Sequence, residues 1–191
     1  MKTLQPKFIV GIGGSAGALS AYKALLDAMP YDTGMAFVII SHMNPSAHNQ
    51  LTKILQRHTK MPVIVAAEAM LIVANHVYVI PPDSDLTMDN YRFKVMSPRS
   101  AGHKQVDVFF ISLANEIGAR AVGIILSGYD GDGSVGCKHI KANGGKIFIQ
   151  DMSAEVNSMP LSALAAGCVD FVLPLKNIPA KLKRLAAALK I

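Results

Sequence analysis

The feature that most constrains the fold is an alternation of short apolar runs with segments of helical periodicity. Apolar runs of strand length occur at 8–13, 35–42, 61–66, 121–128, 146–151 and 170–175. Most of them are separated by segments with one apolar face, such as the face formed by Ala18, Ala21, Leu25 and Met29. Buried parallel strands joined by crossover helices have this pattern. We therefore predict an α/β fold with a doubly wound, mostly parallel, Rossmann-like sheet and helices on both faces.

The parallel pattern is interrupted between residues 76 and 98. HVYVIPP (76–82) and YRFKVMSP (91–98) flank turn-rich residues, which predicts that these two runs pair as an antiparallel hairpin. A helical pattern follows, stops at Gly118, and has an apolar face formed by Val106, Phe109, Phe110, Leu113 and Ile117. Further helices are expected near 46–57, 132–142, 158–166 and 177–190.

Length and composition indicate one folded domain. The 191 residues are 51% hydrophobic and 17% charged, and no linker or repeat divides them. We expect a single domain over 1–191, with a core at about 8–175, a terminal helix at about 177–190 and no receiver domain. No apolar run reaches the roughly 18 residues of a membrane helix, and the first residues lack a signal peptide's apolar core. A monomeric, cytoplasmic protein without membrane insertion is predicted.

The charge and the cysteines exclude two further classes. The net charge of +6 is scattered, and no aromatic residues interleave with the lysines, which argues against nucleic-acid binding. The same charge is compatible with an acidic protein partner. Cys137 and Cys168 have neither the spacing nor the number of a disulfide framework, so we predict buried free thiols.

Three polar side chains follow strands that this fold places side by side. Ser15 follows the first strand, His42 ends the second, and Asp130 and Asp132 follow the strand that begins the second half. Right-handed crossovers bring the loops after these strands to one edge of the sheet. Each residue also has an ordinary reading, because serine and aspartate cap helices and a histidine can simply end a strand.

A serine, a histidine and an aspartate at one edge suggest nucleophilic catalysis. Histidine can take the proton that makes serine a nucleophile, and a buried carboxylate can orient the imidazole. GGSAG (13–17) fits G-x-S-x-G, whose glycines would allow a sharp turn that exposes Ser15 at a helix start. The chain order differs from that of the α/β-hydrolases.

Cofactor and metal motifs fit less well. Gly11, Gly13 and Ala16 form a degenerate dinucleotide fingerprint, but the second strand ends in Ser41 and His42 instead of the acidic residue that holds a ribose. DGDGS (130–134) lacks the glycine and glutamate of a calcium loop. His42 and His48 are six residues apart without an accompanying ligand. No cofactor and no metal are predicted.

Several dispersed blocks of the sequence resemble one family, the catalytic domain of CheB chemotaxis methylesterases. The blocks, from about residue 8 to the end, are IGGSAGA (12–18), VIISHMNPS (38–46), HVYVIPP (76–82), VDVFFISLA (106–114), LSGYDGDGSVG (126–136) and SMPLSALAAGCVDFVLP (158–174). The similarity is greatest to methylesterase modules fused with a receptor methyltransferase and a histidine kinase. Several blocks in the right order are more specific than one glycine motif.

The resemblance implies hydrolysis of glutamate γ-methyl esters on the cytoplasmic helices of chemoreceptors, with deamidation of receptor glutamines as a related activity. It maps a catalytic triad onto Ser15, His42 and Asp132, and oxyanion-hole amides onto Ala16 and Tyr129. Receptor methyltransferase and histidine kinase domains are further candidate partners.

This chain departs from the family pattern at four positions around the implied site. They are Ala16, Ala18, Ser41, which precedes the histidine, and Tyr129. Gly14, Gly17 and Ser41 complete the residues expected around substrate. Two alternatives stay open, a regulatory or scaffold module without turnover and a nucleotide binder.

Overall fold

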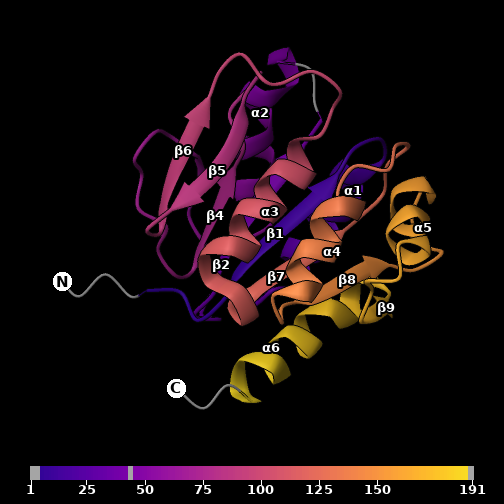
Figure 1. Ribbon diagram of the computed structural model, residues 1–191. Helices are drawn as coiled ribbons and strands as arrows, with labels where there is room; N and C mark the ends of the chain where they lie inside the picture. Colours follow the sequence, from indigo (N-terminus) through magenta and orange to yellow (C-terminus); the bar gives the residue numbers. More distant parts are fainter. Residues whose placement is uncertain (1–4, 43–44, 189–191) are drawn as a thin grey trace.

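Seven parallel strands form the centre of the fold, in a computed structural model that describes residues 5–42 and 45–188 (Figure 1). The strands are β1 (Ile9–Gly14), β2 (Ala36–Ser41), β3 (Val63–Val65), β4 (His76–Val79), β7 (Ala121–Ile125), β8 (Lys146–Gln150) and β9 (Phe171–Leu173). Their order across the sheet is β3-β4-β2-β1-β7-β8-β9. As predicted, β1 lies between β2 and the strand that begins the second half of the chain, β7.

Helices cover both faces of this sheet. One face is covered by α1 (Ala18–Ala28), α2 (Pro45–Gln56) and α6 (Ile178–Ala188), and the other by α3 (Gln105–Ile117), α4 (Ser134–Ala142) and α5 (Ser158–Ala165). Figure 1 shows α3 and α4 side by side on their face. The apolar residues predicted for α1 and α3 are buried in the two cores. The predicted doubly wound α/β class is confirmed.

The predicted antiparallel hairpin exists and its second strand falls within the predicted run 91–98, but the prediction of its first strand was wrong. Residues 76–79 form β4, which pairs in parallel with β2 and β3 inside the main sheet. The hairpin consists of β5 (Asp85–Asp89) and β6 (Arg92–Met96) and lies against α3. Its turn residues Asn90 and Tyr91 both have positive φ, at 48° and 58°. Two successive left-handed residues match the tight turns whose twist suits antiparallel strands.

Several smaller predictions can also be compared with the structure. Cys137 and Cys168 are buried and free, as expected. The described part of α6 ends at Ala188, so the last residues of the helix expected to reach 190 lie outside the described residues. Within 5–42 and 45–188, every helix is too short or too polar to cross a bilayer.

Candidate active site

The register of the central strands brings Ser15 and His42 to neighbouring positions. Gly14, the last residue of β1, is paired with Ser41, the last residue of β2. Ser15 and His42 are the next residues of two adjacent strands, whose axes lie about 4.8 Å apart. On the other side of β1, strand β7 leads into the loop that carries Asp130 and Asp132. The predicted meeting of these loops at one carboxyl edge is therefore found.

Ser15 lies in a tight turn between β1 and α1. Its N–H donates to the carbonyl oxygen of Ser127 at 2.9 Å, and its own carbonyl accepts from the Ala18 N–H at 3.1 Å. Gly17, with φ of 73°, has a left-handed conformation that favours glycine. A Cβ at Gly17 would lie 2.7 Å from Oγ of Ser127, and a Cβ at Gly14 would lie 2.7 Å from the Tyr22 hydroxyl oxygen. A Cβ at Gly13, the first glycine of the G-x-S-x-G pattern, would lie 2.6 Å from Cγ1 of Val106, so close approach requires glycine at 13, 14 and 17.

Ser127 is a positioning residue that sequence reasoning missed. Its side chain is fully buried directly after β7. The Oγ donates to the Ala16 carbonyl oxygen at 2.6 Å and accepts from the Val156 N–H at 2.9 Å. Ser127 therefore ties the turn around Ser15 to the loop before α5. In the sequence, the feature that could have indicated this role is a small polar residue at the end of an apolar run.

Replacing Ser127 with alanine is expected to destabilise this turn. The change leaves the Val156 N–H and the Ala16 carbonyl without their side-chain partner, which costs about 1–3 kcal/mol of the free energy of unfolding. Chemical denaturation measures the loss. Ser134→Ala is the matched control, because the exposed Ser134 hydroxyl makes one local bond to Gly131, and its removal is expected to cost about 0.5 kcal/mol or less. Equal losses in the two variants would contradict the role given to Ser127.

Two backbone amides at this edge are available to a ligand. Within the described residues, the N–H groups of Ala16 and Tyr129 donate to no protein acceptor, whereas those of Ser15 and Gly128 on their N-terminal sides do. The Tyr129 side chain is 72% exposed, so this departure from the family pattern places an aromatic ring at the surface of the site. Ser41, in contrast, is buried beside Tyr22. Ser41 therefore offers no surface to a substrate, unlike its sequence-based prediction.

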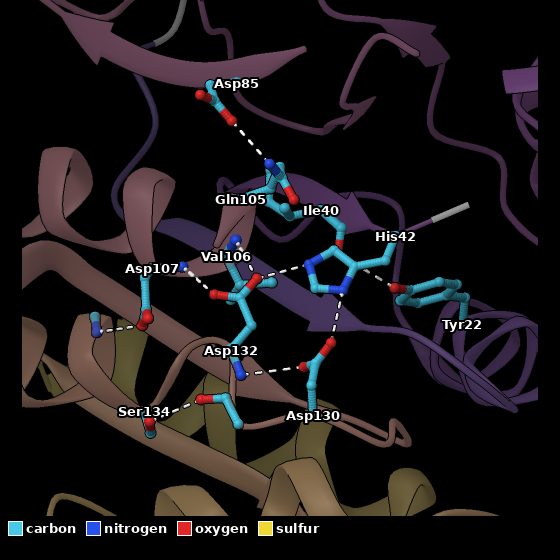
Figure 2. A network of polar contacts seen from close by, with 12 residues as sticks. Tyr22, Ile40, His42, Asp85, Gln105, Val106, Asp107, Asp130, Asp132 and Ser134 are labelled. Carbon is cyan, nitrogen blue, oxygen red and sulfur yellow. Dashed lines mark hydrogen bonds and ion pairs between the residues drawn. The ribbon is translucent and has the colours of Figure 1, made fainter. Parts of the chain in front are cut away.

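The imidazole of His42 lies between two carboxylates, as Figure 2 shows. Its Nε2 is 2.6 Å from Oδ2 of Asp132, and its Nδ1 is 3.2 Å from Oδ2 of Asp130. The side chains of His42 and Asp132 are 4% and 1% exposed, but that of Asp130 is 42% exposed. The two ring nitrogens are thus engaged by aspartates, and the structure places no hydrogen bond between His42 and Ser15.

Asp132 is held by the main chain at the start of α3. Its Oδ2 accepts from the Val106 N–H at 2.8 Å and its Oδ1 from the Asp107 N–H at 2.9 Å. The first N–H groups of a helix have no partner within the helix, so a carboxylate there is stabilised. In exchange, the Asp107 side chain accepts from the Gly136 N–H of α4 at 2.7 Å. Each helix start thus receives a carboxylate from the other segment (Figure 2).

The pKa of His42 reflects opposing effects. Burial favours the neutral ring and lowers the pKa, but the hydrogen bond and charge of Asp132, with a smaller contribution from Asp130, favour the charged ring. The carboxylates outweigh burial, so the pKa of His42 is raised above its ordinary value of 6.5. A base with a raised pKa is strong, but it is charged over a wider range of pH.

Metal binding gains no support at this edge. Asp130 and Asp132 face different nitrogens of the same ring, so their oxygens and the imidazole do not converge on one point. Among residues 5–42 and 45–188, no group of three or more His, Cys, Asp or Glu side chains is arranged to hold a metal ion. His42 and His48 are the pair of possible metal ligands considered from the sequence. The side chain of His48 lies outside the described residues.

Comparisons with known proteins identify the family and the fold of this chain. The profile of the family described as CheB methylesterase matches residues 10–182. The crystal structure of the Thermotoga maritima CheB methylesterase catalytic domain superposes with a TM-score of 0.85 at 26% identity, covering 93% of this chain and 98% of that one. A Leptospira interrogans relative is 33% identical over 171 residues, which are 87% of this chain and 89% of that protein.

Longer relatives are also similar. A Hydrogenovibrio crunogenus protein-glutamate methylesterase/protein-glutamine glutaminase is 32% identical over 93% of this chain and 49% of its own length. A Burkholderia thailandensis protein-glutamate methylesterase/protein-glutamine glutaminase 3 is 35% identical over 94% of this chain and 52% of its own length. The chain spans about half the length of these two proteins. With a family match over most of its length and the same fold, this chain belongs to the CheB methylesterase family of hydrolases.

Proposed function

We propose that this chain hydrolyses glutamate γ-methyl esters on the cytoplasmic helices of chemoreceptors through Ser15, His42 and Asp132. The observation that carries the proposal is the register of β1 and β2, which sets Ser15 beside His42 while Nε2 of His42 binds Asp132 at 2.6 Å. The substrate class follows from the names of the relatives, which are protein-glutamate methylesterases. One sheet that contains strands from both halves of the chain, β1 to β4 and β7 to β9, supports treating the described chain as one catalytic domain.

The chemistry divides into two acyl-transfer steps. Oγ of Ser15 attacks the ester carbonyl while His42 takes its proton, and His42 then gives this proton to the methanol that leaves. Water, activated by His42, hydrolyses the acyl-enzyme and releases glutamate. Asp132 keeps the ring oriented and stabilises its charged form, with its own position fixed by two N–H donors of α3. No cofactor enters these steps.

The free amides of Ala16 and Tyr129 supply the oxyanion hole in this proposal. They follow Ser15 and Gly128, whose own N–H groups are engaged, so the two loops are anchored one residue before each free donor. Backbone N–H groups held in this way need no reorganisation as negative charge develops on the carbonyl oxygen. The same acyl-enzyme can form from a glutamine amide with ammonia as leaving group, and the relatives named above are also glutaminases.

A turnover assay separates this proposal from that of a binding module. A chemoreceptor cytoplasmic fragment carrying tritium-labelled methyl esters is incubated with the chain, and volatile methanol is counted. Methanol release should rise in proportion to the amount of chain. Co-sedimentation with the same fragment measures binding. Binding without methanol release would contradict the proposed function and favour a scaffold role.

A further inference from the structure

Asp130 contacts Nδ1 of His42, and the proposed chemistry gives this contact no role. A carboxylate oxygen only accepts hydrogen bonds, whereas a neutral imidazole has one N–H and one lone pair. With Asp132 at Nε2 and Asp130 at Nδ1, a neutral ring would direct its lone pair at one of the two carboxylates. Only the imidazolium, with an N–H on each nitrogen, satisfies both contacts (Figure 2). The two contacts therefore match a protonated His42 beside two ionised carboxylates.

An imidazolium has no lone pair and cannot take the proton of Ser15. Asp132 is fixed by two backbone N–H donors and its side chain is 1% exposed, so its contact with Nε2 is the permanent one. The nitrogen left for Ser15 is then Nδ1, which Asp130 contacts. Resting on the proposed function, we infer that Asp130 is a positioning residue that holds His42 protonated at rest, and that it must leave Nδ1 before Ser15 can react.

The surroundings of Asp130 allow it to leave. Its side chain is 42% exposed and lines an open groove together with His103 and Lys104, two groups that can carry positive charge. Its contact with Nδ1, at 3.2 Å, is longer than the 2.6 Å contact of Asp132 with Nε2. Asp130 thus makes the longer contact with His42 and is the more accessible of the two carboxylates, and His103 and Lys104 line the same groove.

Few other titratable groups face the ring. Asp130 and Asp132 approach from the loop before α4, and the His103 ring lies 5.7 Å from the His42 ring on the segment before α3. On the α1 side, the Tyr22 hydroxyl bonds the carbonyl of Ile40. Asp107 instead contacts the start of α4 and lies near Asp132. Among these groups, Asp130 is the exposed anion in contact with Nδ1.

The substitution Asp130→Asn removes the charge and keeps the shape. Oδ1 of Asp130 accepts the Asp132 N–H at 3.1 Å, and the asparagine oxygen can keep this local turn. Asp27→Asn is the matched control, because Asp27 on α1 makes an exposed contact with Nδ1 of His58 at 3.0 Å and does not contact the ring nitrogens of His42. Asp130→Ala is the second variant, in which the whole side chain is removed.

The experiment is an NMR titration of the histidine rings combined with the pH profile of kcat/KM. In Asp130→Asn, the titration midpoint of His42 should fall by about half a pH unit or more, since one nearby anion is lost. The acid limb of kcat/KM should move with it, which makes the variant roughly threefold faster below that limb. Asp130→Ala should shift in the same direction. Asp27→Asn should leave the midpoint of His42 unchanged.

Two results would overturn the inference. One is an unchanged His42 midpoint in both Asp130 variants, with thermal unfolding showing that they are folded. The other is a lowered midpoint with no gain in kcat/KM at low pH. The titration is repeated in a Ser15→Ala background, which needs no turnover. Methanol release that does not depend on Ser15 would overturn the proposed function. A shift of the His42 midpoint in the Ser15→Ala background would still support the contact of Asp130 with His42.

Discussion

Ser15→Ala is expected to lower the rate of methanol release by a factor on the order of 10⁴ or more. The variant lacks the oxygen that forms the acyl-enzyme, and no other hydroxyl replaces it in the turn. The fold should not change, because Ser15 is held through its N–H on Ser127 and its carbonyl on Ala18, which alanine retains. Purified variant and wild type are compared on labelled receptor fragment, with far-UV circular dichroism and thermal unfolding as tests of folding.

The control for this result is another serine at the same edge of the sheet. Ser134 begins α4, and its hydroxyl bonds the Gly131 carbonyl at 2.7 Å without contacting His42. Ser134→Ala should therefore retain methanol release close to that of the wild type. A covalent adduct with a fluorophosphonate should appear on wild type and on Ser134→Ala but not on Ser15→Ala. Comparable turnover by Ser15→Ala and wild type would remove Ser15 from the mechanism.

Asp132→Asn should produce the second large loss, on the order of 10³ to 10⁴ in kcat. Three donors converge on this carboxylate, namely Nε2–H of His42 and the N–H groups of Val106 and Asp107. An asparagine has one acceptor oxygen and one NH₂ group, so in either orientation an NH₂ faces at least one donor. The ring loses its orienting anion, and one buried N–H stays unpaired at a cost of about 1–3 kcal/mol.

Kinetics and unfolding together check this expectation. Methanol release gives kcat and KM, and chemical denaturation gives the free energy of unfolding. The loss of the Asp132 charge should also lower the pKa of His42, because that carboxylate is the main cause that raises it. The acid limb of the pH profile should therefore move to lower pH even as the maximal rate falls. A variant with wild-type kcat would show that Asp132 only supports the fold.

The central sheet and the position of β1 between β2 and β7 could be predicted from the sequence, but the pairing of β4 could not. Buried parallel strands have continuous apolar runs, and right-handed crossovers restrict how such runs are ordered. The apolar composition of residues 76–79 is compatible both with a strand of a parallel sheet and with a strand of a hairpin. Composition therefore does not distinguish the two pairings. The turn at Asn90 and Tyr91 lacks the glycine that usually marks a two-residue hairpin loop, so the pairing of β5 with β6 was not recognised.

The candidate site, too, could be predicted from the sequence only in part. Ser15, His42 and Asp132 follow strands whose order is predictable, so their shared edge was predictable too. Which aspartate of DGD contacts which nitrogen of His42 depends on side-chain geometry that spacing does not specify. Ser127 was missed for a related reason, because its two hydrogen bonds go to backbone atoms of distant loops. Contacts of this kind leave no motif in the sequence.

The exchange of carboxylates between α3 and α4 extends the candidate site into a part of the chain that supplies none of its predicted catalytic side chains. The groups that hold Asp132 are main-chain N–H groups at positions 106 and 107. Every amino acid except proline supplies such a donor. These contacts can therefore persist while the side chains at the two positions change, and proline is the one residue that would abolish either. Relatives of very different sequence can share this support for the aspartate, and a comparison of side chains alone would not reveal it.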